Sequence, residues 1–289
     1  MTDSRLITIA SATGGCGKTF FATNAAADLA ARTDGGVLLM DLDLQFGEVA
    51  VALQMRPQHS IIDGLFGRDR QPLPPETTEA VFDELVTQHS AGFDVLSAPS
   101  DPADADLVGE GEIRRILDIA TARYAIVIVD TPPALTEVVL EVLDRSDVII
   151  VMASLDVPSL KNLSVYLRTL QRLDVADDRI GLVLNKVESD VGIDVDQAQE
   201  LFDGRFAGVI SHDRAVSRTI NLGTVLVDAQ PRMKVARQVS QSIRALLPDA
   251  IAAAETERVA RSVARATGSW RRRGSTMRAT ATEVSHETV

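Results

Sequence analysis

Short apolar runs recur along the chain and alternate with segments of helical periodicity. Six runs rich in β-branched residues are predicted to be strands, over residues 6–10, 37–41, 93–97, 124–130, 148–153 and 180–185. None shows the apolar/polar alternation of a strand with one solvated face. Continuous apolar strands separated by helices indicate a doubly wound α/β fold, in which helices cover both faces of a mostly parallel sheet.

One segment shows a clear helical periodicity, and a late change in composition divides the chain into two parts. Leucines recur at steps of three and four at positions 160, 163, 167 and 170. This spacing is typical of an amphipathic helix, and we interpret these leucines as core residues. The α/β pattern runs from residue 5 to residue 247, and after Pro248 the chain becomes rich in Ala, Arg, Ser and Thr. We therefore predict one domain over residues 1–248 and a basic, partly helical or disordered tail over residues 249–289.

Composition narrows the classes of protein to which the chain can belong. The 289 residues carry a formal net charge of -12, and 45% of them are hydrophobic, which is enough for a core without staples. Cys16 is the single cysteine, which excludes an internal disulfide, and four scattered histidines offer no metal-ligand spacing. The N-terminus does not read as a signal peptide, and no apolar run approaches the ~20 residues that span a bilayer. We predict a cytoplasmic protein.

A glycine-rich turn joins the first predicted strand to a predicted helix over residues 18–31. Its sequence is Ala12-Thr13-Gly14-Gly15-Cys16-Gly17-Lys18-Thr19. Glycines let successive backbone N–H groups surround phosphate oxygens, and the helix N-terminus adds a positive dipole. Lys18 can reach the β- and γ-phosphates, and the Thr19 hydroxyl can ligate Mg2+. Ala12 replaces the first glycine of G-x-x-x-x-G-K-[ST], but the strand–loop–helix context still predicts a phosphate loop.

Polar residues follow the ends of three other predicted strands. Asp41 ends the second and Asp43 comes just after it, Asp130 ends the fourth, and Asn185 ends the sixth, with Lys186 next. The carboxyl ends of parallel strands converge on one crevice, so we expect these side chains beside the loop. Asp130 is predicted to hold Mg2+ directly or through water, and Asp43 to lie at the metal and position the attacking water. The Asn185 amide can pair with a purine edge. For Asp41 alone, a solvated turn is an open alternative.

Taken together, these motifs resemble those of the ParA/MinD superfamily of deviant Walker A ATPases over residues 5–247. Four blocks carry the resemblance: GGCGKT, DLDLQFG, VIVDTPP and LVLNK. The sequence is most similar to the CpaE/TadZ branch of Flp (Tad) pilus assembly. Residues 41–50 resemble the switch I of that branch, residues 158–163 its post-strand helix, and residues 229–236 its late loop.

The resemblance implies an ATP-sandwich homodimer that uses ATP and Mg2+ as cofactors. It implies that Lys18 acts on the phosphates, that Thr19 and Asp130 serve the metal, and that Asp43 lies near the lytic water. It also implies that Asn185 contacts adenine. The implied nucleotide-binding set is Thr13, Gly14, Gly15, Cys16, Gly17, Lys18, Thr19, Phe20, Asn185, Lys186 and Pro231, the last closing over the base.

Two residues of the loop depart from the family pattern. The family places a signature lysine just before the two glycines, where it reaches the partner's phosphates, but this chain has Thr13. A trans-acting cation of the arginine-finger kind accelerates phosphoryl transfer by ~10³–10⁵. Phe20 replaces a threonine that often follows the loop. We therefore predict an ATPase whose intrinsic hydrolysis is slow, and we interpret Cys16 as a small residue in a tight turn.

Two charged segments leave alternatives open. Between residues 205 and 244, seven Arg and Lys accompany two Asp, which is consistent with a surface for DNA, for an acidic partner, or with a solvated face. Arg258, Arg261 and Arg265 surround a thin apolar stripe in the tail, which is consistent with binding to an anionic membrane or with disorder.

The function predicted from these features is an ATP-binding dimeric switch that positions or regulates Flp/Tad pilus assembly. Its partners would be pilus and secretion proteins, and its place the cytoplasm, at a cell pole or at the inner face of the membrane. One alternative is a septum-site or chromosome/plasmid partition ATPase. The other is a nucleotide-bound adaptor that does not hydrolyse ATP.

Overall fold

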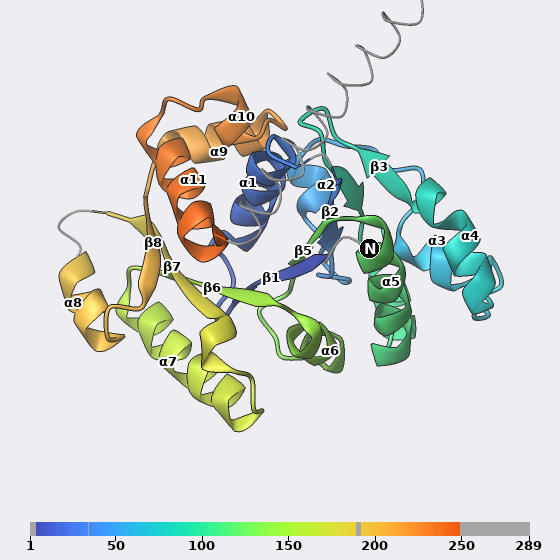
Figure 1. The fold of residues 1–289 in the computed structure, drawn as a ribbon, viewed down its shortest axis with the longest axis horizontal. Coiled ribbons are helices and arrows are strands. Elements are labelled where there is room, and N and C mark those ends of the chain that lie inside the picture. The colour runs from blue at the N-terminus through green and yellow to red at the C-terminus, as the bar shows by residue number, and fades with distance from the viewer. Residues whose placement is uncertain (1–3, 34, 189–191, 249–289) are drawn as a thin grey trace, which may run out of the picture.

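The computed structural model describes residues 4–33, 35–188 and 192–248, which form one sheet between two layers of helices (Figure 1). The strands are β1 (Arg5–Ser11), β2 (Val37–Asp41), β3 (Val86–Gln88), β4 (Asp94–Leu96), β5 (Ile126–Asp130), β6 (Val148–Ser154), β7 (Ile180–Val187) and β8 (Phe206–Ser211). Their spatial order is β3-β4-β2-β5-β1-β6-β7-β8, and β3 pairs antiparallel with β4 while every other pair is parallel. This confirms the predicted doubly wound α/β fold.

Helices cover both faces of the sheet. On one face lie α1 (Lys18–Ala30), α2 (Val49–Ala52), α9 (Arg214–Asn221), α10 (Leu226–Ala229) and α11 (Lys234–Leu246). On the other lie α3 (Ile61–Leu65), α4 (Pro75–Leu85), α5 (Glu110–Arg123), α6 (Glu137–Arg145), α7 (Val157–Arg172) and α8 (Val195–Leu201). Two 3-10 turns, Pro102–Leu107 and Asp177–Arg179, complete the elements.

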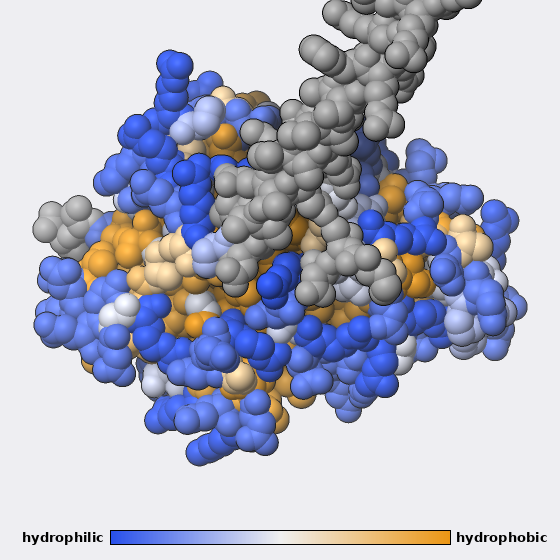
Figure 2. All heavy atoms as spheres, viewed as in Figure 1, coloured by the Kyte–Doolittle hydropathy of each residue, from blue (hydrophilic) through white to orange (hydrophobic). Residues whose placement is uncertain are grey.

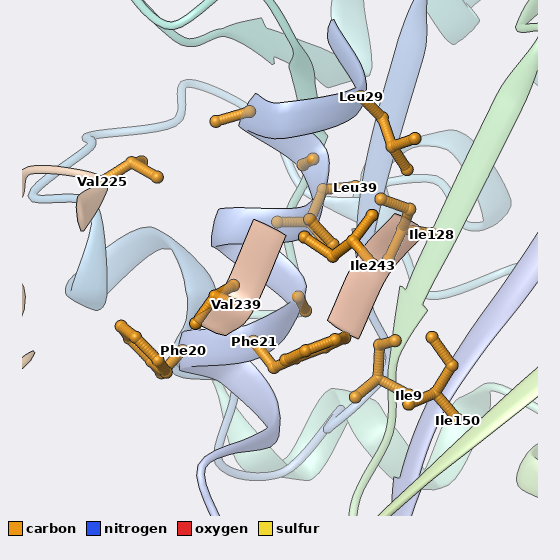
Figure 3. Close-up of a cluster of buried hydrophobic side chains, with 14 of the residues drawn as sticks. Ile9, Phe20, Phe21, Leu29, Leu39, Ile128, Ile150, Val225, Val239 and Ile243 are labelled. Carbon is orange, nitrogen blue, oxygen red and sulfur yellow. The ribbon is translucent and has the colours of Figure 1, made fainter. Parts of the chain in front are cut away.

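Successive residues of each central strand point to opposite faces of the sheet and so contribute to two different hydrophobic cores. Ile7 and Ile9 of β1 pack under α1 and α11, whereas Leu6 of the same strand packs under α5. Figure 3 shows Phe21 of α1 extending toward Ile9 and Ile243 of α11 lying beside Ile128. The central strands are thus buried on both faces, which is why their sequences are continuously apolar.

Most predicted strands match the structure, and two strands were not predicted. The predicted strand 37–41 has the bounds of β2, and the predicted helix 18–31 ends one residue earlier, at Ala30. β8 was missed because it is an edge strand with alternating burial and an internal glycine, Gly208. β3 was missed because its three residues are too short to show any period.

One face of the described part can be judged by its hydropathy. Hydrophilic side chains cover most of the face seen in Figure 2. None of the helices built from the described residues is long and apolar enough to cross a membrane. The tail 249–289 lies outside the described residues, and the division of the chain at Pro248 therefore stays a prediction.

Candidate functional site

The phosphate loop occupies the turn between β1 and α1, as the sequence predicted. Gly15 and Gly17 have φ angles of 73° and 90°, in the left-handed region that side chains disfavour. Gly17 is the N-cap residue of α1, so the loop ends where the positive end of a 13-residue helix begins. An added Cβ at Gly14 or Gly15 would meet nothing within 4 Å. The loop therefore presents open backbone N–H groups beside a helix N-terminus, which suits an anion.

Lys18 is held close to this loop. Its side chain is largely buried, and its Nζ donates a hydrogen bond of 3.2 Å to Oγ of Ser11. The Ser11 hydroxyl donates in turn to the Thr13 carbonyl at 2.7 Å. Ser11 was not among the predicted site residues, although its position as the last residue of β1 marks it as a neighbour of the loop. The lysine is thus tethered near the place where phosphates would bind.

Thr19 and Asp130 meet at the first turn of α1. The Thr19 hydroxyl donates a hydrogen bond of 2.6 Å to Oδ2 of Asp130, at the end of β5. Oδ1 of Asp130 is buried and has no hydrogen-bond partner among the described residues. Burial raises the pKa of Asp130, and the Thr19 hydrogen bond and the charge of Lys18 oppose that rise. The structure thus brings these two residues together, and their service to a metal stays a prediction.

Asp41 lies beside Asp130 on the neighbouring strand. The two residues are directly paired in the register of β2 and β5. Asp41 is buried, and its oxygens accept hydrogen bonds from the backbone N–H of Asp43 at 3.2 Å and of Val49 at 3.0 Å. Burial, and then the charge of Asp130, raise its pKa. Asp41 therefore anchors both ends of the loop over residues 42–48 and is not a solvated turn residue.

Asp43 lies in that loop but does not line the pocket that contains Lys18. Its Oδ1 accepts a hydrogen bond from the N–H of Phe46 at 3.2 Å. It lines an adjacent cavity together with Pro132 and Glu137. A role near the lytic water stays a prediction for Asp43.

The residues that depart from the family pattern have definite contacts. Oγ1 of Thr13 lies 2.8 Å from the Sγ of Cys16, and that sulfur lies 3.8 Å from Oγ of Ser159 on α7. Cys16 is buried inside the turn, as expected of a small filling residue. Phe20 is buried in the core and also borders the pocket. The Thr13 side chain is uncharged and bonded within its own loop.

A pocket of about 370 Å³ extends from the loop toward the ends of β7 and β8. Its lining includes Gly15, Gly17, Lys18, Thr19, Phe20, Glu48, Asn185, Lys186, Glu188, His212 and Asp213. Nδ2 of Asn185 donates to the carbonyl of Cys16 at 2.8 Å, and Nδ1 of His212 lies 2.7 Å from Oε1 of Glu188. Of these, Glu48, Glu188, His212 and Asp213 were not predicted. The end of the unrecognised strand β8 would have indicated His212 and Asp213.

Pro231 lies apart from this pocket. It lines a separate cavity with Asp28 and Arg237, between α1 and α11. The prediction that Pro231 closes over the base therefore lacks support in the geometry, because the late loop packs on the α11 side in this conformation.

The oxygen donors at Thr19 and Asp130 fit Mg2+. Mg2+ prefers oxygen ligands and usually keeps several waters beside one or two protein groups and the substrate phosphates. The unpartnered Oδ1 of Asp130 supplies an acceptor that nothing else in the described residues uses. Within those residues no group of three or more His, Cys, Asp or Glu side chains is arranged for a metal ion. The site fits a nucleotide-linked ion better than a metal cage.

Comparisons with known proteins agree with this geometry. A family model described as an AAA domain, AAA_31, matches residues 4–180. The tyrosine-protein kinase etk of Escherichia coli (strain K12) is 30% identical over 191 residues, which are 64% of this chain and 24% of that protein. The chain thus spans about a quarter of the length of this curated relative.

Solved structures share the fold at low sequence identity. The ParA family ATPase from Chlorobium tepidum TLS has a TM-score of 0.73 and 21% identity, covering 83% of this chain and 98% of that chain. The septum site-determining protein MinD from Pyrococcus horikoshii OT3, complexed with Mg-ADP, has a TM-score of 0.70 and 19% identity, covering 83% and 95% of the two chains.

The matched family segment contains the phosphate loop, the Asp41–Asp43 segment and Asp130. The fold around it is that of the ParA/MinD P-loop ATPases. The chain therefore belongs to the AAA_31 family of AAA domains.

Proposed function

We propose that this protein is an ATP- and Mg2+-dependent switch whose intrinsic hydrolysis is slow. The observation that carries the proposal is the meeting of Thr19 and Asp130 at 2.6 Å, beside Lys18 and an open glycine loop. A buried carboxylate with one unused oxygen next to a phosphate loop is suited to a metal–nucleotide complex.

Each of these residues has a definite part in that proposal. The loop N–H groups and Lys18 bind the phosphates, and Thr19 and Asp130 hold Mg2+. When bound, Mg2+ neutralises charge on the phosphates. Asp43 orients the attacking water once its loop brings it toward the phosphates. Lys186, exposed at the far end of the pocket, borders the nucleoside.

Slow hydrolysis follows from the charge of the loop. Thr13 stands where relatives supply a cation, and its hydroxyl is engaged with Cys16 instead. Without that cation, charge that develops on the phosphates in the transition state is less stabilised, whereas ground-state binding keeps Lys18. The missing cation therefore lowers the rate of ATP turnover more than it lowers the affinity for ATP.

The proposed active form is a homodimer that encloses ATP. Phe46 and Val51 are 71% and 75% exposed and lie in and just after the Asp43 loop, near the nucleotide pocket. Large apolar side chains exposed at a nucleotide site are suited to a second copy of the chain.

The proposed cellular task is to position or regulate Flp/Tad pilus assembly in the cytoplasm. Support comes from the similarity of residues 41–50, 158–163 and 229–236 to the CpaE/TadZ branch. A peripheral position at the membrane would use the tail. Partition of DNA is the competing task, supported by the cations between residues 205 and 244. Co-purification with pilus secretion proteins, against a salt-sensitive shift of plasmid DNA with ATP, distinguishes the two tasks.

The names of the curated relatives raise a different activity, tyrosine phosphorylation. The chain contains two tyrosines, Tyr124 and Tyr166. The Tyr124 hydroxyl donates to Asp94 at 2.8 Å, and Tyr166, on α7, is buried in the core. Neither is presented as an acceptor for phosphate, which favours a switch over a kinase that phosphorylates its own chain.

Binding and turnover, measured together, test the proposal. Calorimetry of the purified protein is expected to show ATP binding that strengthens with Mg2+, with turnover well below one per second. Thr13→Lys is expected to raise turnover while leaving affinity within a few-fold. Thr13→Lys without any gain would support the non-hydrolysing adaptor. Unassisted turnover of several per second by the natural sequence would contradict slow hydrolysis, and absence of ATP binding would reject the switch.

A further inference from the structure

Helix α9 ends in a Schellman motif, in which a residue with left-handed backbone, usually glycine, closes the helix. Gly223 has a φ angle of 64°, and its N–H donates to the Ile220 carbonyl at 3.0 Å. The N–H of Thr224 donates to the Thr219 carbonyl, also at 3.0 Å. The two bonds leave the carbonyl of Asn221, the last helical residue, to a partner from outside the motif.

Helix α2 ends in the same motif, but a glutamine stands where glycine is usual. The N–H of Gln54 donates to the Val51 carbonyl at 3.0 Å, and that of Met55 donates to the Ala50 carbonyl at 2.9 Å. Gln54 has a φ angle of 50°, in the left-handed region that residues with a side chain disfavour. A glutamine kept in this conformation points to a use for its side chain.

The ends of the two helices contact each other through these residues. Nε2 of Gln54 donates to the Asn221 carbonyl at 2.7 Å and so completes the end of α9. A Cβ added at Gly223 would lie 2.6 Å from the Cβ of Gln54 and 3.0 Å from the Leu53 carbonyl oxygen, so a side chain at position 223 has no room. We call this contact of Gln54 with Asn221 and Gly223 the α2–α9 clasp.

Both clasped helices line the pocket beside the phosphate loop. The lining residues from the two helices and the N-cap of α2 are Glu48, Ala52, Val216, Ser217 and Ile220. The clasp follows directly in the chain after Ala52 and after Ile220. A change in the clasp is therefore expected to move this wall of the pocket.

Helix α2 is attached at both of its ends. The N–H of Val49, its first residue, donates to Oδ2 of the buried Asp41 at 3.0 Å, and the clasp holds its other end. A helix of four residues is not stable by itself. The place of Ala52 in the pocket wall therefore depends on both attachments.

We propose that Gln54 is a positioning residue for the nucleoside, which acts by holding α2 and α9 together as one wall of the pocket. This inference rests on the proposed function, since it requires a nucleotide in this pocket. The glycine loop and Lys18, which are proposed to bind the phosphates, are not part of the clasp. Loss of the clasp is therefore expected to weaken the binding of a whole nucleotide and to spare the binding of the phosphates alone.

Gln54→Ala tests this difference, because it removes the hydrogen bond to α9. Calorimetry of the full-length protein measures the affinities for Mg-ATP and for Mg-tripolyphosphate. The affinity for Mg-ATP is expected to fall roughly two- to tenfold, as for the loss of one neutral hydrogen bond, and that for Mg-tripolyphosphate to stay within about twofold. An equal fall for both ligands, or no fall for either, would overturn the inference.

Gln54→Gly separates the side chain from the backbone conformation. Glycine suits the left-handed region, so this variant is expected to fold even if Gln54→Ala does not. It also lacks the hydrogen bond to Asn221, and the same selective loss of Mg-ATP affinity is expected. Normal Mg-ATP affinity in Gln54→Gly would show that the amide has no role in positioning.

Gly223→Ala breaks the clasp from its other side. Because this change and Gln54→Ala disrupt one contact, the double variant is expected to lose little more Mg-ATP affinity than the more affected single variant. Losses that simply add would show that the two residues act separately and would contradict the clasp.

Gln199→Ala is the matched control. Nε2 of Gln199 donates to the Phe206 carbonyl at 3.0 Å and ties α8 to β8, at a place that does not line the pocket. This variant is expected to lose free energy of unfolding and to keep the ratio of Mg-ATP to Mg-tripolyphosphate affinity. A ratio that changes as much as in Gln54→Ala would attribute the effect to instability and reject the role of Gln54.

The natural sequence is titrated first. If it binds neither ligand, the proposed function fails, and the inference that rests on it fails with it. If it binds both ligands and the ratio of their affinities is unchanged in Gln54→Ala and in Gln54→Gly, the proposed function stands and only the role of Gln54 is overturned.

Discussion

The Thr19 hydroxyl donates a hydrogen bond of 2.6 Å to Asp130, although the two residues are 111 positions apart in the chain. The bond ties the first turn of α1 to the end of β5 and leaves Oδ1 of Asp130 without a partner among the described residues. Both partners are oxygen groups of the kind that Mg2+ binds. Helix α1 and the central strand are thus joined at the point where a cation would bind.

Asp130→Asn is expected to lower the affinity for Mg2+ in the presence of ATP about 10–100-fold, the range typical of groups that support a metal site. The amide can still accept from Thr19, so the fold is expected to remain. Calorimetry with ATP at several Mg2+ concentrations measures the change. Asp144→Asn, an exposed aspartate on α6, is the control. Unchanged Mg2+ dependence in Asp130→Asn would remove this residue from the metal site.

The Mg2+-free protein is expected to lose stability as pH rises through the neutral range. Burial raises the pKa of Asp130 from 3.8 to about 7 and that of Asp41 from 3.8 to about 8. At pH values between the ordinary pKa of each carboxyl group and its raised pKa, the folded chain keeps a proton that the unfolded chain has lost. The free energy of unfolding therefore decreases as pH rises, by at most about 1.4 kcal/mol per pH unit for each retained proton.

Denaturant unfolding without Mg2+ at pH 5, 6, 7 and 8 checks this slope. Asp41→Asn is expected to flatten it, because one of the two raised carboxyl groups is gone. Asp144→Asn is expected to leave it unchanged. A free energy of unfolding that increases from pH 5 to 8 in the natural sequence would contradict the assignment of the slope to this pair.

Gly17→Ala is expected to abolish phosphate binding and to destabilise the protein by at least ~1–2 kcal/mol, the cost of a side chain in the left-handed region. The new Cβ would also collide with the Asn185 amide at 2.4 Å. Gly111→Ala, on helix α5, provides the contrast. Its added Cβ would meet nothing within 4 Å, and this substitution is expected to raise the free energy of unfolding by a few tenths to ~1 kcal/mol. Thermal unfolding of both variants tests the pair, and equal effects would refute the conformational argument.

Phe46→Ser is expected to weaken nucleotide-dependent dimerisation, because it removes a large apolar side chain that is 71% exposed near the site. Sedimentation of the ATP-loaded protein over a concentration series measures the dissociation constant of the dimer. Leu201→Ser on α8, where the leucine is 67% exposed, is the control for the loss of any exposed apolar residue. Equal weakening in both variants, or none in either, would argue against a dimer through the Phe46 face.

The sequence was most informative where local pattern and tertiary position agree. The strand 37–41 was predictable because burial on both faces makes it continuously apolar. Lys18 was placed at the site by the glycine-rich loop before a helix, and Asp130 by the convergence of strand ends in a parallel sheet. Strand β8 was not predictable, because an edge strand with alternating burial gives a weak sequence signal. Since β8 was not recognised, His212, which follows it at the pocket, was not recognised either.

Other parts of the site depend on contacts that no local pattern encodes. The chemistry of the Asn185 amide does not reveal that its Nδ2 donates to the Cys16 carbonyl at 2.8 Å, because that contact depends on where the loop lies relative to the end of β7. Pro231 was placed by resemblance alone, and it borders a different cavity because the loop before α11 packs toward α1. Positions that are set by long-range packing require coordinates.

Asp41 and Asp130 stand level at the ends of β2 and β5, with both side chains buried. When both are ionised, the middle of the sheet ends in two charges that push its strands apart. A divalent cation would turn that repulsion into a shared attraction and draw the strands together. The ends of β2 and β5 are therefore expected to separate more readily in the empty protein than in the loaded one.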